Sequence, residues 1–555
     1  MEGTKPQSGA GHSPLIWWVA PLIWGIILAR QEEASLSPLI LVILGLVSTA
    51  AALTLTLRRN WFIQPIWAGL LLLGGTFLAW AYAELRMQPS VTDPPLLPRE
   101  AELQLQIDRL FQVKASQPRL SGYATVVKAP GHLEPFVGQP LSFSLWQELN
   151  RAQVLPGSII TVRGKLSELE PSADLSDFEQ YLLRSGYSLR LDQGKLSELV
   201  KPASAFRQWC TRVNQAVTDK LYAGAVTERE RMLAGVVAAM LLGKKSELEG
   251  GVKATFIASG TMHLFAVSGL HVGLIALTLA LSFRILRLPG WLGALLGLGL
   301  LYLYVQIIGG TPSALRAFTM VACYWGALAI NRRPVPFSAL LTSALIVLLV
   351  DPMQLYHAGF QLSYTVVAAI LLYAVPLTEA VQTRYQPYRF IPEESLRPLQ
   401  RLLQKLYTAL VGSAAVSLAA FLYSSPMTVA YFEVFAPGAI LLNIILVPLA
   451  MLTLVAALLA SSTGLIGASL LTLLFNHAAW ILVLGMWTLV SGMVSIPGLF
   501  WQAEMSQAWL APLGTALLLL SLLATQGGRS RPWRFLLPLM ILLPGLVFGV
   551  SFVQG

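Results

Sequence analysis

A stretch of thirteen residues in the second half of the chain combines side chains that could carry chemistry. Residues 261–273, "TMHLFAVSGLHVG", place His263, Ser268 and His271 among mostly apolar neighbours. In a regular helix Ser268 and His271 lie one turn apart on the same face, as a nucleophile and its base would. Polar and ionisable groups at membrane depth are costly, so they call for a functional explanation. The stretch is compatible with a catalytic pair, a metal site or part of a path through a membrane.

The two enzymatic interpretations lack residues that they require. The Gly-x-Ser-Gly tetrad of intramembrane serine proteases has Ala266 in place of its first glycine, and the Gly-x-Ser-x-Gly turn of hydrolases is absent. Ser268 and His271 alone supply neither an oxyanion hole nor a third orienting group. A zinc site needs three or four ligands, and no further His or Cys stands near the two histidines in the sequence. We therefore expect no metal, no cofactor and no enzymatic activity.

The composition predicts a membrane protein. Of the 555 residues, 55% are hydrophobic and 12% are charged, about half the charged share of an average soluble protein. Apolar runs recur at the length that spans a bilayer as a helix. Cys210 and Cys323 lie far apart in sequence and indicate no disulfide framework. The run "LLGKKS" (241–246) has Ala238 where a phosphate loop needs its first glycine, so no nucleotide site is predicted.

We expect a polytopic α-helical membrane protein with about 11–13 transmembrane helices, because the chain contains thirteen candidate spans. They cover residues 15–30, 37–57, 61–83, 262–283, 289–308, 313–330, 336–350, 359–378, 406–424, 438–460, 466–490, 508–525 and 534–552. The first run lacks a cleavage site and is predicted to be a helix rather than a signal peptide. The chain then divides into N-terminal transmembrane helices (1–89), an extracytoplasmic domain (90–225), an amphipathic interfacial segment (226–260) and a second transmembrane domain (261–555).

Clusters of Lys and Arg predict the orientation, because such clusters are retained on the cytoplasmic side of a membrane. Five clusters follow candidate spans, at 58–59, 284–287, 332–333, 384–405 and 529–534. With thirteen spans and a cytoplasmic N-terminus all five fall inside, which places 90–225 and the C-terminus outside. The net charge of +10 lies mostly in these loops, since residues 99–209 hold 13 Lys and Arg against 12 Asp and Glu.

The region before residue 225 has the character of a small β-domain. Short β-rich runs separated by Gly, Pro and polar residues stand at 103–107, 121–127, 139–146 and 158–166. About five such strands fit a small barrel of OB type, with a short helix predicted for 177–187.

A group of polar residues and helix breakers lies in the second apolar block: Arg316, Gln361, Ser363, Tyr364, Asn443 and Pro448. A hydrogen bond between packed helices would explain any one of them, and Asp351 at a helix end is best explained as a cap. Together they are too many for packing alone, and polar groups at membrane depth are tolerated where they line a water-filled cavity. The ends of interrupted helices also favour anions. These residues predict a conduit for a polar or anionic substrate.

The same motifs resemble those of a known family. "GTMHLFAVSGLHVGL", "GGTPSALRAFTM", "DPMQLYHAGFQLSY" and "APGAILLNIILVPL" are similar, in this order, to the membrane motifs of ComEC-type competence proteins, which pass single-stranded DNA across the bacterial inner membrane. "LPGSIITVRGKLSELEPSADLSDFEQYLLRSGY" resembles the end of that family's extracellular OB-like domain. The resemblance implies that residues 261–555 form the channel domain. It also implies that these motif residues shape the pore or hold its helices together: His263, Ser268, Gly269, His271, Arg316, Gly359, Phe360, Gln361, Ser363, Pro437 and Asn443.

The resemblance implies partners as well. They are single-stranded DNA, membrane lipid, a cytoplasmic helicase-like motor, a periplasmic DNA-receptor protein and a separate nuclease. For such a substrate the β-domain offers aromatic residues of the kind that stacks on bases: Tyr123, Phe136, Phe143 and Trp146. Because the domain is nearly neutral, we expect it to bind DNA weakly on its own. Many relatives carry a C-terminal metallo-β-lactamase-like domain, but no ligand motif of such a domain precedes Gly555, so we expect no nuclease activity from this chain. Lys244 stands where relatives usually have an acidic residue. A transporter of another polar or anionic compound and a membrane hydrolase using Ser268 are the alternatives.

Overall fold

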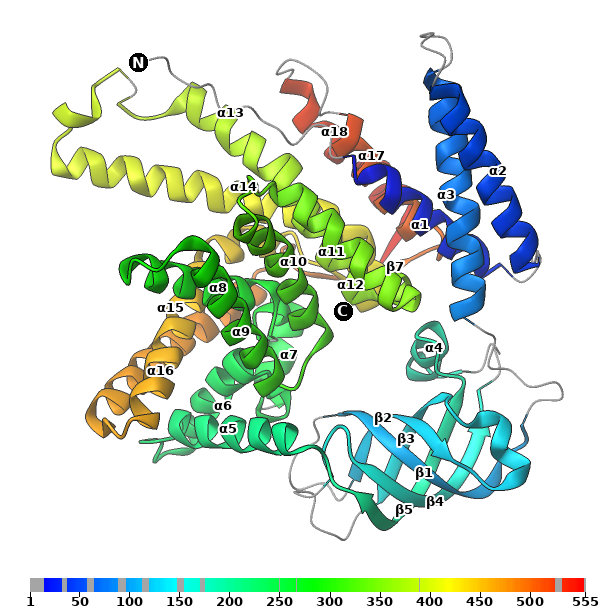
Figure 1. The fold of residues 1–555 in the computed structure, drawn as a ribbon. Helices are drawn as coiled ribbons and strands as arrows, with labels where there is room; N and C mark the ends of the chain where they lie inside the picture. Colours follow the sequence, from blue (N-terminus) through cyan, green and yellow to red (C-terminus); the bar gives the residue numbers. More distant parts are fainter. Residues whose placement is uncertain are drawn as a thin grey trace.

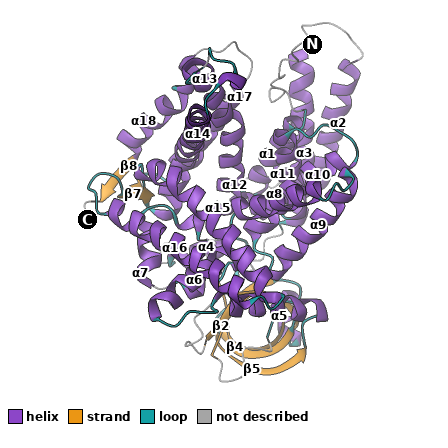
Figure 2. Cartoon of the chain, turned by 90° about the vertical axis from the view of Figure 1, so that its left-hand side faces the viewer, coloured by secondary structure: helices purple, strands orange, loops and turns teal. Residues whose placement is uncertain are grey.

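Helices make up most of the computed structural model, and the long strands gather at one end of it (Figure 1, Figure 2). The structure describes residues 14–31, 37–56, 64–87, 96–111, 119–146, 154–169, 175–248, 250–265, 267–388, 390–524 and 532–553. Within these residues, each of the thirteen predicted apolar segments coincides with helical residues.

Eight helices in the described part of the chain are long and apolar enough to cross a membrane. They are Pro38–Leu55, Ile66–Arg86, Met262–Ile285, Gly290–Ile307, Ala358–Tyr385, Pro398–Phe432, Ala439–Leu465 and Ser469–Val494. Three shorter apolar helices accompany them: Ile16–Ala29, Pro336–Val350 and Leu510–Leu523. The polytopic helical fold is therefore confirmed, and the number of membrane crossings stays a prediction.

The helices of the membrane part follow one another with short connections. In chain order they are α1 (Ile16–Ala29), α2 (Pro38–Thr56), α3 (Gln64–Arg86), α5 (Ala205–Leu221), α6 (Glu228–Leu242), α7 (Gly250–Ala258), α8 (Gly269–Ile285), α9 (Gly290–Ile307), α10 (Pro312–Ala329), α11 (Pro336–Val350), α12 (Ala358–Ala369), α13 (Val375–Tyr385), α14 (Pro398–Phe432), α15 (Gly438–Leu465), α16 (Ser469–Val494), α17 (Leu510–Ala524) and α18 (Leu537–Gly549). Proline opens α10, α11 and α14, where its fixed φ suits the first helical turn and its missing N–H is not needed.

The described helices pack into two large apolar cores, and a small third cluster joins α2 to α3. The first core unites α5, α6, α7, α8, α9, α15 and α16. The second unites α1, α3, α11, α12, α14, α17 and α18. Helix α10 contributes Ala314 and Ala317 to the first core, whereas Met320, one turn further on, packs against the second. The first turns of α10 therefore stand at the boundary between two independently packed groups of helices.

The strands at one end form a closed five-stranded barrel. They are β1 (Arg99–Leu110), β2 (Arg119–Lys128), β3 (Pro140–Trp146), β4 (Ile159–Glu168) and β5 (Leu189–Lys201). Their order around the barrel is β1-β2-β3-β5-β4, with β3 and β5 parallel and the other pairs antiparallel. Alternate residues of β1 point inward, as the period of a strand requires. The four predicted strands and the short helix α4 (Asp177–Arg184) are confirmed.

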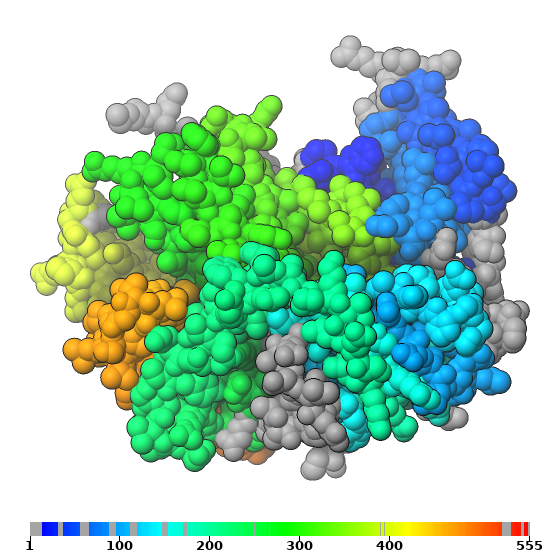
Figure 3. Space-filling model, turned by 60° about the horizontal axis from the view of Figure 1, so that its bottom comes forward, coloured from blue at the N-terminus to red at the C-terminus, as the bar shows by residue number. Residues whose placement is uncertain are grey.

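The barrel is smaller than the predicted domain 90–225, because α5 belongs to the membrane part. Val217 and Leu221 of α5 lie in the first helical core. The Asn214 side chain donates to the carbonyl of Ile307 at 3.0 Å, and no part of α5 contributes to the core of the barrel. Figure 3 shows the barrel beside α5 and α6 on one face of the molecule, with α15 and α16 at the edge of that face.

The segment 226–260 is predicted to be amphipathic and to lie at the membrane surface, but its first helix, α6, is buried among other helices. Ten consecutive residues of α6, from Leu233 to Leu242, are buried on every side of the helix. The run "LAGVVAAMLL" consists of small and apolar residues, which let α15 and α16 approach closely all around it. Its polar first turn is closed by a capping box between Thr227 and Glu230, which explains the charge that suggested an amphipathic helix.

Candidate functional site

The stretch 261–273 is broken rather than continuously helical. A short turn, η6 (Met262–Leu264), is followed by α8, which begins at Gly269 with Ser268 as its N-cap. Ala266, the residue that argued against a protease tetrad, lies outside the described residues. The motif thus forms the entry into a helix, and its polar residues cap that entry.

The two histidines of this stretch stand in different environments. His263 is exposed, with Nδ1 3.1 Å from the carbonyl oxygen of Gly260. His271 is fully buried, and its Nδ1 lies 2.8 Å from Ser268 Oγ and accepts the Ser268 N–H at 3.2 Å. Because Nδ1 accepts a backbone N–H, the neutral ring carries its hydrogen on Nε2. That Nε2 is buried without a hydrogen-bond partner among the described residues, so no third group orients the imidazole as a hydrolase would need.

The first motif meets the second at the start of α10. Ser313 Oγ donates to the carbonyl of Val267 at 2.7 Å. Gly269 faces Ala317, such that a Cβ on Gly269 would lie 3.8 Å from the Cβ of Ala317. These contacts hold the start of α8 against the first turns of α10.

The second motif meets the third through Arg316. This side chain is 6% exposed and lies at the boundary of the two cores. A Cβ on Gly359, in the first turn of α12, would lie 3.0 Å from its Nη2, so the glycine makes room for the guanidinium. Within the described residues Arg316 has no ion pair, and its Nε has no hydrogen-bond partner. Phe360 packs on Tyr364 behind it, with ring centroids 4.4 Å apart.

The third motif reaches toward the fourth through Gln361. Its amide nitrogen donates to the carbonyl of Leu355 at 2.8 Å, and its oxygen accepts from the Tyr431 hydroxyl at 3.0 Å. Tyr431 stands at the end of α14, shortly before the fourth motif. Ser363, two residues further along α12, is half-buried and makes no hydrogen bond through its side chain within the described part of the chain.

The fourth motif returns to the first. Pro437 is the N-cap of α15. Its neighbour Ala436 packs against Gly260 of the first motif. Gly260 has a φ of +68°, a backbone conformation that other L residues adopt only with strain. A Cβ on Gly260 would lie 3.1 Å from that of Ala436. Asn443, in the second turn of α15, has its Oδ1 buried without a partner among the described residues. The four motifs therefore meet around one place, which we call the junction.

Buried polar atoms without a hydrogen-bond partner occur on the motif helices. Nine buried side-chain nitrogen or oxygen atoms in the described part of the chain have no partner, and four of them lie on motif helices. These four are His271 Nε2, Arg316 Nε, Tyr364 Oη and Asn443 Oδ1. A buried unsatisfied polar group costs about 1–3 kcal/mol, so contact with water or a polar ligand would stabilise each of these atoms.

The barrel touches the membrane part beside the junction. Ser185 Oγ lies 3.4 Å from His357 Nδ1, and the rings of Tyr181 and His357 are 6.3 Å apart. A Cβ on Gly186 would lie 3.2 Å from the methyl carbon of Met353, which places the turn after α4 against η7 (Pro352–Tyr356). Figure 1 shows α4 between the barrel and α12. His357 is the N-cap of α12, so this contact lies two residues from Gly359.

An aromatic ladder runs from the barrel wall to this contact. Tyr123 and Tyr187 stack with centroids 4.1 Å apart, and Phe111 meets Tyr123 edge-on at 4.9 Å. Phe178 and Tyr181 of α4 continue the ladder at 6.5 Å. Burial raises the pKa of the Tyr187 hydroxyl to about 12, so it stays a neutral donor. Of the aromatic residues predicted to stack on bases, Phe136 and Phe143 fill the barrel core and Trp146 is exposed elsewhere, so only Tyr123 belongs to this ladder.

Charges of both signs lie at the contact between the barrel and the membrane part. Burial lowers the pKa of His357, Asp351 opposes that shift, and the cations of Arg316 and Arg109 add to it. Asp108 of the barrel and Asp351 lie close enough to Tyr187 to add to the rise of its pKa. Arg109 of β1 therefore brings a cation to this contact, with Asp108 beside it in the sequence.

Two residues singled out in the sequence have structural roles. Asp351 is a cap, as predicted: its carboxylate accepts from the Met353 N–H at 3.0 Å and from the Gln354 amide at 2.8 Å. Lys244 follows the left-handed C-cap Gly243 of α6 and donates to Gln215 of α5 at 3.3 Å. The glycine-lysine run is thus the turn that ends α6.

Comparison with known proteins agrees with this arrangement. Residues 240–527, slightly more than half of the chain, match the model of the competence protein family, and the chain belongs to that family. It is 30% identical over 216 residues to a ComE operon protein 3 of Bacillus subtilis, and 32% identical over 146 residues to an uncharacterized protein of Aquifex aeolicus. These alignments cover 39% and 26% of this chain but only 24% and 34% of the relatives. No solved structure matches the chain.

The sequence missed the residues that join the motifs to one another and to the barrel. Ser313, Tyr431 and His357 stand in or beside the motifs but are ordinary hydrogen-bonding residues in the sequence. The sequence does show that the predicted short helix 177–187 carries two tyrosines, Tyr181 and Tyr187, and this could have indicated the ladder.

Proposed function

We propose that this protein is a membrane conduit for single-stranded DNA taken up in natural transformation. Membership of the competence family, together with similarity to a ComE operon protein, supports a role in competence. The observation that carries the proposal is Arg316, a guanidinium that is 6% exposed and has no ion pair within the described residues. A buried charge without a partner is strongly destabilising, and the phosphates of a passing strand would compensate it.

The setting of Arg316 favours an anion. Its Nη2 lies against Gly359 in the first turn of α12, where the helix dipole is positive. The planar guanidinium matches the oxygens of a phosphodiester better than a lysine would. A single arginine with a helix end binds each phosphate weakly, which suits a strand that must keep moving.

The boundary between the two helical cores suits a path. Each core packs internally, and Arg316 of α10 contacts Gly359 of α12 where the two cores meet. Separation along this boundary would leave both cores intact and would hydrate the unbonded atoms of His271 and Asn443. A path elsewhere would have to break one of the cores, at a cost of roughly 25 cal/mol for every Å² of apolar surface exposed.

The barrel supports entry of a nucleic acid from its side of the junction. We infer an OB-like fold from the strand order β1-β2-β3-β5-β4 and the parallel β3–β5 pair. In OB-folds the connection between the fourth and fifth strands helps to bind oligonucleotides. Here that connection carries α4, and it leads the Tyr123–Tyr187 ladder to His357. Stacked bases would pass from this ladder to the guanidinium of Arg316.

The partners and the orientation belong to the same proposal. The positive loops favour a cytoplasmic N-terminus, with the barrel and the C-terminus outside the bacterial inner membrane. Because the sequence shows no nucleotide site, a cytoplasmic helicase-like motor would pull the strand, and a periplasmic receptor would deliver it. A separate nuclease would degrade the second strand, and the chain itself would not be an enzyme.

Substitution of Arg316 tests this function. We expect Arg316→Leu to reduce internalised labelled DNA and transformation frequency at least tenfold at an unchanged membrane level, and Arg316→Lys to retain part of the uptake. The matched control is Arg332→Leu, which removes the same charge from an exposed turn. In all three strains DNA bound at the cell surface should stay normal, whereas normal uptake by Arg316→Leu would exclude the proposed path. Deletion of the gene should abolish uptake and leave surface binding intact.

A further inference from the structure

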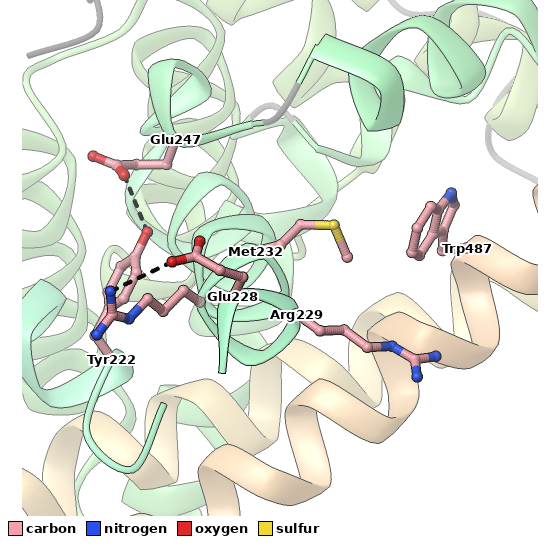
Figure 4. Close-up of a pocket in the computed structure, with 7 residues that line it drawn as sticks. Tyr222, Glu228, Arg229, Met232, Glu247 and Trp487 are labelled. Carbon is pink, nitrogen blue, oxygen red and sulfur yellow. Dashed lines mark hydrogen bonds and ion pairs between the residues drawn. The ribbon is translucent and has the colours of Figure 1, made fainter. Parts of the chain in front are cut away.

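A second polar site lies away from the junction, where α5 ends and α6 begins. A cavity of about 620 Å³ opens between these helices, η5 (Lys245–Glu247) and α16 (Figure 4). Its lining residues are Tyr222, Glu228, Arg229, Arg231, Met232, Glu247 and Trp487. None of them belongs to the four motifs, so the conduit does not account for this cavity.

One wall of the cavity presents two carboxylates. The Tyr222 hydroxyl donates to Glu247 Oε2 at 3.0 Å, and Arg231 Nη1 lies 3.7 Å from Glu228 Oε1 (Figure 4). Burial raises the pKa of Tyr222, and the charge of Glu247 adds to the shift, so the hydroxyl stays protonated as a donor. A carboxylate has about four lone-pair sites. Each carboxylate therefore keeps acceptor capacity for a cationic donor in the cavity.

The other wall presents a cation and an apolar surface. Arg229 extends toward the side where Trp487 lies, and Met232 stands between that side and the carboxylates (Figure 4). Within the described residues the Arg229 side chain has no ion pair and no hydrogen bond. An indole, a thioether and a free guanidinium together suit a phosphate attached to an apolar group.

The cavity lies toward one end of a helix that is long enough to cross a membrane. Trp487 belongs to α16, one of the helices long enough to cross a membrane, and stands seven residues before its end at Val494. Seven residues of helix correspond to about 10 Å. Tryptophan at this distance from a helix end is typical of the headgroup region.

We propose that this cavity binds a phospholipid whose headgroup carries both a phosphate and a primary ammonium, as phosphoethanolamine does. The phosphate pairs with Arg229, the ammonium donates to Glu228 or Glu247, and the glycerol and first methylenes lie on Met232 and Trp487. A purely anionic headgroup would face two carboxylates, of which only Glu228 has an ion-pair partner within the described residues, Arg231. A choline headgroup has no N–H to donate to them.

Lipid binding to the full-length purified protein tests this site. Native mass spectrometry would compare phosphatidylethanolamine, phosphatidylglycerol and phosphatidylcholine with identical acyl chains, each added to delipidated protein. We expect phosphatidylethanolamine to bind about tenfold more tightly than the other two, the change that one charge-assisted contact provides. Arg229→Ala and Glu228→Gln should each remove this preference, whereas Arg212→Ala, on exposed α5 surface outside the cavity, should keep it.

Three results would overturn the proposal. Equal binding of the three lipids by the unmodified protein would show that the cavity does not select a headgroup, whether or not any variant folds. A preference for phosphatidylglycerol would exclude the ammonium contact. Full competition by soluble glycerophosphoethanolamine at the concentration of the lipid would show that the bilayer is not the source of the ligand.

Discussion

Replacing Gly359 by alanine should disable the junction without disturbing the helices. The added methyl group would lie 3.0 Å from Nη2 of Arg316, well inside ordinary van der Waals contact. The guanidinium, at the end of a flexible side chain, would have to give way by a few tenths of an ångström, and leaving its rotamer would cost about 0.5–1.5 kcal/mol. Since about 1.4 kcal/mol corresponds to a factor of ten, we expect transformation frequency to fall by up to about tenfold.

Gly269→Ala is the matched control for this prediction. It also belongs to a motif and also lies in a first helical turn, but its new methyl group would lie 3.8 Å from the Cβ of Ala317, an ordinary contact. Both substitutions change helix propensity by about 1 kcal/mol in the same direction. Transformation would be measured in strains with equal membrane levels of the two variants. Equal uptake by both would refute the inferred packing of Arg316 against α12.

Three further predictions follow from the barrel contact and from α6. Tyr187→Leu removes the stacking partner of Tyr123 and should reduce uptake about tenfold, because stacking on one base contributes about 1–3 kcal/mol; unchanged uptake would separate the ladder from the path. Burial holds the pKa of His357 below its usual 6.5, so the contact with Ser185 is stable above that value and weakens as the pH falls toward the lowered pKa. Protection of the turn after α4 against hydrogen exchange, corrected for the intrinsic pH dependence of exchange, should therefore fall as the pH drops below about 6.5 in the native protein and not in His357→Gln. Val237→Asp places a charge in the centre of buried α6 and should remove the protein from the membrane, whereas a surface helix would tolerate it, as immunoblots of membrane fractions would show.

The helical segments were predictable because their signal is long and repeated. Runs of about twenty apolar residues have few stable forms other than a membrane helix. Four of the five barrel strands were predictable from short β-rich runs between turns. Strand β5 was not predicted, because "LDQGKLSELV" mixes polar and apolar residues. The cap at Asp351 followed from its place before a proline at a helix end.

Tertiary contacts account for what the sequence did not predict. The charged first turn of α6 suggested a surface helix, but only packing shows that Leu233–Leu242 is enclosed by α15 and α16. The motif residues were identified one by one, whereas their meeting depends on contacts such as Arg316 with Gly359, which join segments about forty residues apart. The periodic pattern of apolar residues in the sequence carries no information about such long-range contacts. For the same reason the boundary between the two cores has no signature in the sequence.

The most direct test of the conduit is to trap DNA at the junction during uptake. Ser313→Cys is nearly isosteric and places a thiol on the contact with Val267, in a chain whose Cys210 and Cys323 are replaced by alanine. DNA with thiol-reactive groups on its phosphates would be arrested in transit, and covalent protein–DNA adducts would be counted. We expect adducts at position 313 and none at Leu295→Cys on the exposed face of α9. Equal adduct yields at both positions, or none at 313 in cells that still take up DNA, would contradict a path through the junction.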